Sequence, residues 1–212
     1  MNTYPNRPLF LLHMLRPLFM VISIVLTLTG CSKTDISPLE KNAVIVAFGD
    51  SLTQGTGVSL DKSYPAVLQA LTGHAVINAG VSGETTRQGL IRFSKVLEQQ
   101  QPQLVILLEG GNDFLKKVPH DKIKANLARM IAIAHEKQIA VLLVGVPNKP
   151  LWGSADLYDE LAEEWHIPLE EDIVPSLMRR TSMKSDYVHF NEQGYQALAE
   201  AIYSALQTSG AL

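Results

Sequence analysis

The sequence predicts a three-layer α/β/α sandwich built on a five-stranded, mostly parallel sheet. Short runs rich in β-branched residues alternate along the chain with longer amphipathic segments, as strands joined by crossover helices do. The runs are almost continuously apolar, which is typical of strands covered on both faces. The 212 residues are 46% hydrophobic and 18% charged, which is enough for one domain with a sizeable core.

Each expected strand ends at a glycine or a turn. The strands are residues 43–49, 74–80, 103–111, 140–146 and, with a weaker pattern, 167–173. The expected helices are Tyr64–Leu71, Thr85–Gln100, Asp121–Gln138 and residues 191–207. In the last two helices, apolar residues recur on one face at helical spacing and should face the core. These core positions are Ile123, Leu127, Met130, Ile131, Ala134, Tyr195, Leu198, Ala199, Ile202 and Leu206.

The N-terminal segment has the features of an export signal. An apolar run, Leu18–Gly30, follows Arg7 and Arg16 and ends in small residues. The run is shorter than the roughly 20 residues that an ordinary spanning helix needs. Either Met1 or Met14 is compatible with the start of such a signal.

The run ends in "LTGC", which resembles the bacterial lipoprotein signal. That resemblance implies that Cys31, the chain's single cysteine, is lipidated and becomes the mature N-terminus. An uncleaved anchor and a soluble exported protein remain alternatives. The polar segment Ser32–Asn42 is then interpreted as a tether. The expected divisions are residues 1–30 for the signal, 31–42 for the lipid-anchored tether and 43–212 for the folded domain. By the same resemblance, serine at position 32 favours the outer membrane.

The stretch "FGDSLTQG", residues 48–55, follows the first strand and presents Ser51 as a candidate nucleophile. Ligands of parallel sheets bind beyond the carboxyl ends of the strands. A serine nucleophile needs a base, and the base needs an orienting acceptor. In "SDYVHFN", Asp186 precedes His189 by three residues, so one loop supplies both groups. The other histidines lie in the signal, on a helix face, at a strand start or in connections: His13, His135, His74, His120 and His166.

Two further segments offer hydrogen-bond donors for an oxyanion. Gly83 in "NAGVSGETT" follows the second strand. Because glycine has no side chain to block the approach, its backbone N–H can face a substrate. Asn112 in "EGGND" follows the third strand and carries a side-chain amide. The N–H of Ser51 is the third candidate donor.

Four blocks in this order, "FGDSLT", "NAGVSGETT", "LLEGGND" and "DYVHFN", resemble the GDSL or SGNH hydrolases. The likeness extends over most of residues 43–207 and is strongest to the small bacterial thioesterase, lysophospholipase and arylesterase group. It implies a flavodoxin-like fold, Ser51 as nucleophile, His189 as base and then acid, and Asp186 as its orienting group. It also implies an oxyanion hole formed by Ser51, Gly83 and Asn112.

Where many relatives carry D-G-x-H-P, this chain has Tyr187 and Phe190 in the glycine and proline places. The G-x-S-x-G elbow of ordinary α/β-hydrolases is absent at Ser51.

The expected function is hydrolysis of small-molecule or lipid carboxylic esters, thioesters included, without a metal or cofactor. A net charge of −3 and the lack of a basic block argue against nucleic acid as a partner. We expect a monomer, attached to a membrane only through Cys31. A carbohydrate O-deacetylase and a noncatalytic envelope lipoprotein are the alternative functions. Residues expected near the substrate are Phe114, Leu151 and Trp152, with Lys116 and Lys117 as candidates for an anionic group.

Overall fold

The computed structural model describes residue 1 and residues 35–149 and 153–212. Apart from Met1, the predicted signal lies outside the described residues, as do Cys31 and the two pocket candidates Leu151 and Trp152. Within the described part of the chain, no helix has both the length and the apolar character needed to cross a membrane.

The sheet has five strands in the order β2-β1-β3-β4-β5, and every neighbouring pair is parallel. The strands are β1 (Val44–Gly49), β2 (Ala75–Gly80), β3 (Leu104–Leu108), β4 (Ala140–Val144) and β5 (Leu169–Glu170). The predicted parallel α/β architecture is therefore confirmed. The fifth strand is only two residues long, because the chain turns into helix α7 (Ile173–Met178) three residues after it.

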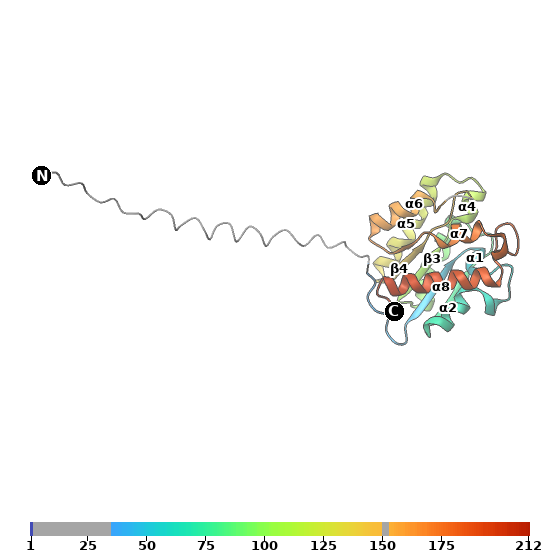
Figure 1. Cartoon of the computed structure of the whole chain (residues 1–212), viewed down its shortest axis with the longest axis horizontal. Coiled ribbons are helices and arrows are strands. Elements are labelled where there is room, and N and C mark those ends of the chain that lie inside the picture. The colour runs from blue at the N-terminus through green and yellow to red at the C-terminus, as the bar shows by residue number, and fades with distance from the viewer. Residues whose placement is uncertain (2–34, 150–152) are drawn as a thin grey trace. The chain divides into compact units, whose positions relative to one another are not determined.

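Helices cover both faces of this sheet. On one face, α2 (Tyr64–Thr72) packs against α8 (Glu192–Thr208), and Figure 1 shows the two lying side by side. On the other face, α3 (Thr86–Gln100) packs against α5 (His120–Glu136), which also contacts α6 (Asp156–Trp165). Right-handed crossovers explain this division. The connection from β1 to β2, which contains α2, runs across the sheet in the opposite direction from the connections that contain α3, α5 and α6, so α2 lies on the opposite face.

Two short helices follow strands at the edge that carries the candidate site. They are α1 (Ser51–Gln54) after β1 and α4 (Gly111–Leu115) after β3. Neither was predicted, because four or five residues show no helical period. Helices α6 and α7 were also not predicted. The sequence pattern favours a loop over residues 148–158, which overlaps only the start of α6, and a fifth strand that extends to Ile173, the first residue of α7.

The predicted core faces of α5 and α8 are confirmed. All ten positions are buried, and the central strands β1 and β3 are buried along nearly their whole length. Capping residues explain where α3 and α8 begin. Thr85 and Gln88 form a reciprocal capping box at α3, and the Asn191 side chain accepts the Gly194 N–H at α8.

The predicted free tether is wrong over residues 36–42. The N–H of Ile36 donates to the Ser209 carbonyl at 2.7 Å, and the N–H of Leu39 donates to the Ala211 carbonyl at 2.9 Å. The Ile36 side chain is 7% exposed and belongs to the core. Ile36 and Leu39 are apolar residues within a polar stretch, and both pack beside the end of α8. The domain therefore begins before residue 43, and the chain enters it at the amino edge of the sheet.

Substituting Ile36 tests this docking. We expect Ile36→Ala to lower the free energy of unfolding by about 2 kcal/mol, near the lower end for a buried isoleucine. Leu60→Ala is the control: Leu60 is 71% exposed, so its loss should change stability by less than about 0.5 kcal/mol. Urea unfolding of both variants makes the measurement. Equal stability of Ile36→Ala and the wild type would mean that the segment is a free tether after all.

Candidate active site

The site lies where three neighbouring parallel strands end. Ser51 follows β1, Gly83 follows β2 and Asn112 follows β3, and all three line one pocket together with His189. Gly49, the last residue of β1, has no room for a side chain, because a Cβ there would overlap the Leu108 carbonyl and the Thr53 hydroxyl. The close approach of β1 to β3 at this point therefore requires glycine.

Ser51 is the first residue of α1 and is 9% exposed. The preceding Asp50 caps the helix, since its Oδ1 accepts the Leu52 N–H at 2.9 Å. Gly55 ends the helix in the left-handed region, with φ of 91°. These two caps hold a single helical turn with Ser51 at its start.

The loop between α7 and α8 brings His189 to Ser51. The distance from His189 Nε2 to Ser51 Oγ is 3.0 Å, and the distance from His189 Nδ1 to Asp186 Oδ2 is 2.7 Å. An ionised carboxylate can only accept hydrogen bonds, so Nδ1 carries the hydrogen and Nε2 is left as an acceptor facing the hydroxyl. This arrangement can take a proton from Ser51.

Asp186 is held in its charged form. Besides the His189 ring, its carboxylate accepts the backbone N–H groups of His189 and Val188, each at 2.8 Å. The bond to the His189 ring contributes most to lowering the pKa of Asp186 to about 2, with the backbone bonds adding to it. Asp186 therefore stays ionised at every pH at which the protein is expected to work.

The candidate oxyanion donors come from three segments. Gly83 has φ of +78°, a conformation that side-chain-bearing residues rarely adopt, although a Cβ there would meet no neighbour within 4 Å. Backbone conformation and not space therefore favours glycine at this position. Asn112 lies in the first turn of α4, and its amide Nδ2 donates to Asp50 Oδ2 at 3.2 Å. The structure thus brings together all five candidate catalytic and oxyanion-hole residues: Ser51, Gly83, Asn112, Asp186 and His189.

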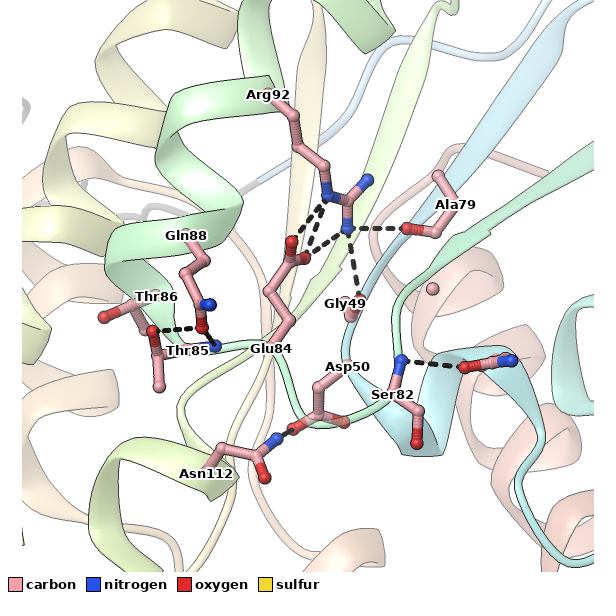
Figure 2. A network of polar contacts seen from close by, with 12 residues as sticks. Gly49, Asp50, Ala79, Ser82, Glu84, Thr85, Thr86, Gln88, Arg92 and Asn112 are labelled. Carbon is pink, nitrogen blue, oxygen red and sulfur yellow. Dashed lines mark hydrogen bonds and ion pairs between the residues drawn. The ribbon is translucent and has the colours of Figure 1, made fainter. Parts of the chain in front are cut away.

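A network that sequence analysis missed holds the loop of Gly83 (Figure 2). Glu84 is 6% exposed and forms an ion pair with Arg92 of α3. Arg92 also donates to the carbonyls of Ala79 at 2.9 Å and Gly49 at 3.3 Å, and it lies over the Phe48 ring. One arginine therefore connects the ends of β1 and β2 to the residue next to Gly83.

A second contact anchors the same loop from the side of Ser51. The Ser82 N–H donates to Gln54 Oε1 at 2.7 Å, which ties the loop to the end of α1. Gln54 and Arg92 are separated in sequence from the residues they hold, so no local pattern indicated either contact.

Buried carboxyl groups surround the base of the site. Asp50 is 2% exposed, and burial raises its pKa from 3.8 to about 6, with the neighbouring Asp113 and Glu84 acting in the same direction. The Leu52 N–H and His189 oppose this shift. Burial also raises the pKa of Glu109 well above its ordinary value, and the charges of Asp50 and Glu84 add to the effect.

The pocket has a volume of about 270 Å³ and a mostly apolar wall. Its apolar side chains include Phe114, Leu115, Val146, Val174, Met178 and Val188. Phe114 lies in the pocket wall as predicted. Neither Lys116 nor Lys117 is among the residues that line this pocket. Lys116 lies beside it and donates to the Gly83 carbonyl at 3.2 Å. Among the described residues, no group of three or more His, Cys, Asp or Glu side chains is placed to hold a metal ion.

Known proteins resemble this chain over most of its length. Residues 47–197 match the model of the GDSL-like lipase/acylhydrolase family. An arylesterase of Vibrio mimicus is 30% identical over 174 residues, which are 76% of this chain and 87% of the relative. Thioesterase 1/protease 1/lysophospholipase L1 of Escherichia coli strain K12 is 28% identical over 174 residues, covering 77% of this chain and 83% of the relative.

The likeness extends to three dimensions. The crystal structure of TesA superposes with a TM-score of 0.73 at 25% identity, covering 78% of this chain and 99% of that protein. The family match alone takes in well over half of the chain, and it confirms the resemblance drawn from the four sequence blocks. The protein therefore belongs to the GDSL-like lipase/acylhydrolase family and is a carboxylic ester hydrolase.

Proposed function

We propose that the protein is a serine esterase that cleaves acyl or aryl esters through Ser51, His189 and Asp186 and a covalent acyl-enzyme. The observation that carries this proposal is the chain of two hydrogen bonds from Ser51 Oγ to His189 and from His189 to Asp186. A hydroxyl, a neutral imidazole and an ionised carboxylate in this order are the parts that nucleophilic acyl transfer requires.

In the first step, Ser51 Oγ attacks the carbonyl carbon while its proton passes to His189 Nε2. The carbonyl π electrons move to oxygen, and the N–H groups of Ser51 and Gly83 and the Asn112 amide stabilise the negative charge. The loss of one such donor typically costs about 3–4 kcal/mol of transition-state stabilisation. Asp186 stabilises the imidazolium and keeps the hydrogen on Nδ1.

In the second step, the tetrahedral intermediate collapses and the C–O bond to the alcohol breaks. The leaving alkoxide takes the proton from His189 Nε2. Water then attacks the acyl-enzyme while His189 removes its proton, and the carboxylic acid leaves as Ser51 regains the hydrogen. Every proton is taken and returned by the same imidazole.

Because the wall of the pocket is mostly apolar, it supports binding of an acyl or aryl group of the substrate. The named relatives, an arylesterase and a thioesterase that is also a lysophospholipase, point to the same class of compound. A panel of p-nitrophenyl acyl esters, a lysophospholipid, an acyl thioester and acetylated sugars would rank these substrates. Preference for acetylated sugars would instead support the O-deacetylase alternative.

Ser51→Ala tests the nucleophile. We expect the loss of the hydroxyl to lower kcat by about 10⁴-fold or more, because no acyl-enzyme can form. Ser82→Ala removes another hydroxyl from the same pocket and is the matched control, with activity expected within about 5-fold of the wild type. Hydrolysis of p-nitrophenyl butyrate measures both. Substantial activity in a folded Ser51→Ala protein would rule out the mechanism.

Asp186→Asn tests the orienting carboxylate. The amide cannot stabilise the imidazolium and favours the wrong tautomer, so kcat should fall by about 10²–10⁴-fold while KM changes little. The exposed Asp121, on the first turn of α5, supplies the control substitution Asp121→Asn. A rise in KM at unchanged kcat would assign Asp186 to substrate binding instead.

We further propose that the protein is an envelope lipoprotein, exported by its N-terminal signal and anchored through Cys31. The support is the coincidence of the basic residues, the apolar run Leu18–Gly30 and the "LTGC" motif. Because Ile36 is already docked, only residues 32–35 are left as a linker between Cys31 and the domain. Four residues span at most about 14 Å, so an anchored domain would stay close to the membrane surface.

The mass of the mature protein tests the anchor. In the membrane fraction of an expressing bacterium, we expect a polypeptide that starts at Cys31 and carries acyl groups. Several acyl chains buried in the bilayer give stable attachment, whereas one does not. Cys31→Ser should abolish the modification, and Ser32→Ala should preserve it. An unmodified thiol or a different mature N-terminus would contradict the anchor and leave the esterase proposal untouched.

A further inference from the structure

Asp50 lies between Ser51, the candidate nucleophile, and Asn112, one of the three candidate oxyanion donors. Its side chain is buried, and each of its two oxygens has a partner. Oδ1 accepts the Leu52 N–H at 2.9 Å, and Oδ2 accepts Asn112 Nδ2 at 3.2 Å. The contact between Asp50 and Asn112 joins residues 62 positions apart in the sequence and is drawn in Figure 2.

This contact decides which way the Asn112 amide faces. The NH₂ and oxygen of an amide exchange places when the group rotates by half a turn, and the two orientations have the same shape. A carboxylate accepts hydrogen bonds and donates none, so Oδ2 of Asp50 selects the orientation in which the NH₂ faces it. One N–H is used by Asp50, and the second is left for the pocket that Asn112 lines.

The fold accommodates this carboxylate closely. A Cβ on Gly111, the residue before Asn112, would come within 3.2 Å of Asp50 Oδ2. The buried charge also has an electrostatic cost, since burial and the nearby Asp113 and Glu84 make Asp50 harder to ionise. An asparagine at position 50 would still cap a helix without that cost, so capping alone does not account for an acid here.

We propose that Asp50 is a positioning residue for ester hydrolysis, which fixes the Asn112 amide so that an N–H, and not the amide oxygen, faces the oxyanion. This inference rests on the proposed esterase function and assigns Asp50 no direct contact with the reacting atoms. Asp50, which precedes Ser51 in the sequence after β1, thus acts through Asn112, a donor that follows β3.

Asp50→Asn separates this role from helix capping. The side-chain oxygen of the introduced asparagine can still accept the Leu52 N–H, which is fixed in the helix. The introduced NH₂ then meets the NH₂ of Asn112, and two donors cannot pair. The Asn112 side chain is free to rotate, so it turns its oxygen toward the pocket, where a lone pair would repel the oxyanion.

The test is a double-mutant cycle measured with p-nitrophenyl butyrate at pH 8. We expect Asp50→Asn to lower kcat by about 10²-fold, as loss of an oxyanion donor does, with KM within about 3-fold of the wild type. Asn112→Ala should have a similar effect. In the Asn112→Ala background, Asp50→Asn should change kcat by less than about 3-fold, because the donor it positions is gone.

Urea unfolding supplies the structural control. The pKa of Asp50 in the folded protein, about 6, exceeds its ordinary 3.8, so this group's contribution to stability falls as the pH rises between these values and stays low at pH 8. Asp50→Asn should therefore be at least as resistant to urea at pH 8 as the wild type. Asp50→Ser, which keeps a capping oxygen but cannot reach Asn112, is the second variant and should show a smaller loss of kcat.

Three results would overturn the inference. They are wild-type kcat in Asp50→Asn, wild-type kcat in Asn112→Ala, and multiplication of the two single effects in the double variant. Ser51→Ala, measured in the same assay, keeps this failure distinct from failure of the proposed function. If activity depends on Ser51 but the cycle is additive, only the role of Asp50 is wrong.

Discussion

Parallel pairing of β1 with both β2 and β3 is the constraint on which the site depends. In this register Gly49 lies opposite Gly80 on one side and Leu108 on the other. Adjacent strands are roughly 4.8 Å apart, so three strand ends from distant parts of the sequence meet within a small area. Ser51, Gly83 and Asn112 follow those ends by two, three and four residues. A shift of one residue in either pairing would move a candidate donor away from Ser51, the candidate nucleophile.

Polar side chains beneath the site hold these strand ends in place. Arg92 joins Gly49, Ala79 and Glu84, while Asp50 joins α1 to Asn112. Buried ion pairs add little net stability on average, because desolvation offsets the attraction between the charges. Their contribution here is better understood as fixing positions. Burying carboxyl groups beneath the site makes them harder to ionise, and burial accordingly raises the pKa values of Asp50 and Glu109.

The loop of His189 reaches the site from outside the sheet. Asp186 accepts two backbone N–H groups of its own loop, so this carboxylate, the candidate orienting group, also shapes the segment that carries the imidazole. Phe190, at the place where the resemblance to the family predicts proline, is fully buried and packs edge-on against Tyr195 of α8. Tyr187, in the glycine place, is exposed. The departures from the family pattern therefore anchor the loop and alter its surface without separating His189 from Ser51.

Local sequence determined the alternation of strands and helices, the buried faces of α5 and α8, and the residues of the family blocks, because each depends on spacing within a short stretch. Tertiary structure alone decided the docking of Ile36 and the pairing of Asp50 with Asn112 and of Arg92 with Gly49. These contacts join residues tens of positions apart, and each partner has an ordinary local role as a linker, cap or surface residue. Hydrogen bonding across the ends of a folded sheet selects them, and no period or motif of the chain encodes that proximity.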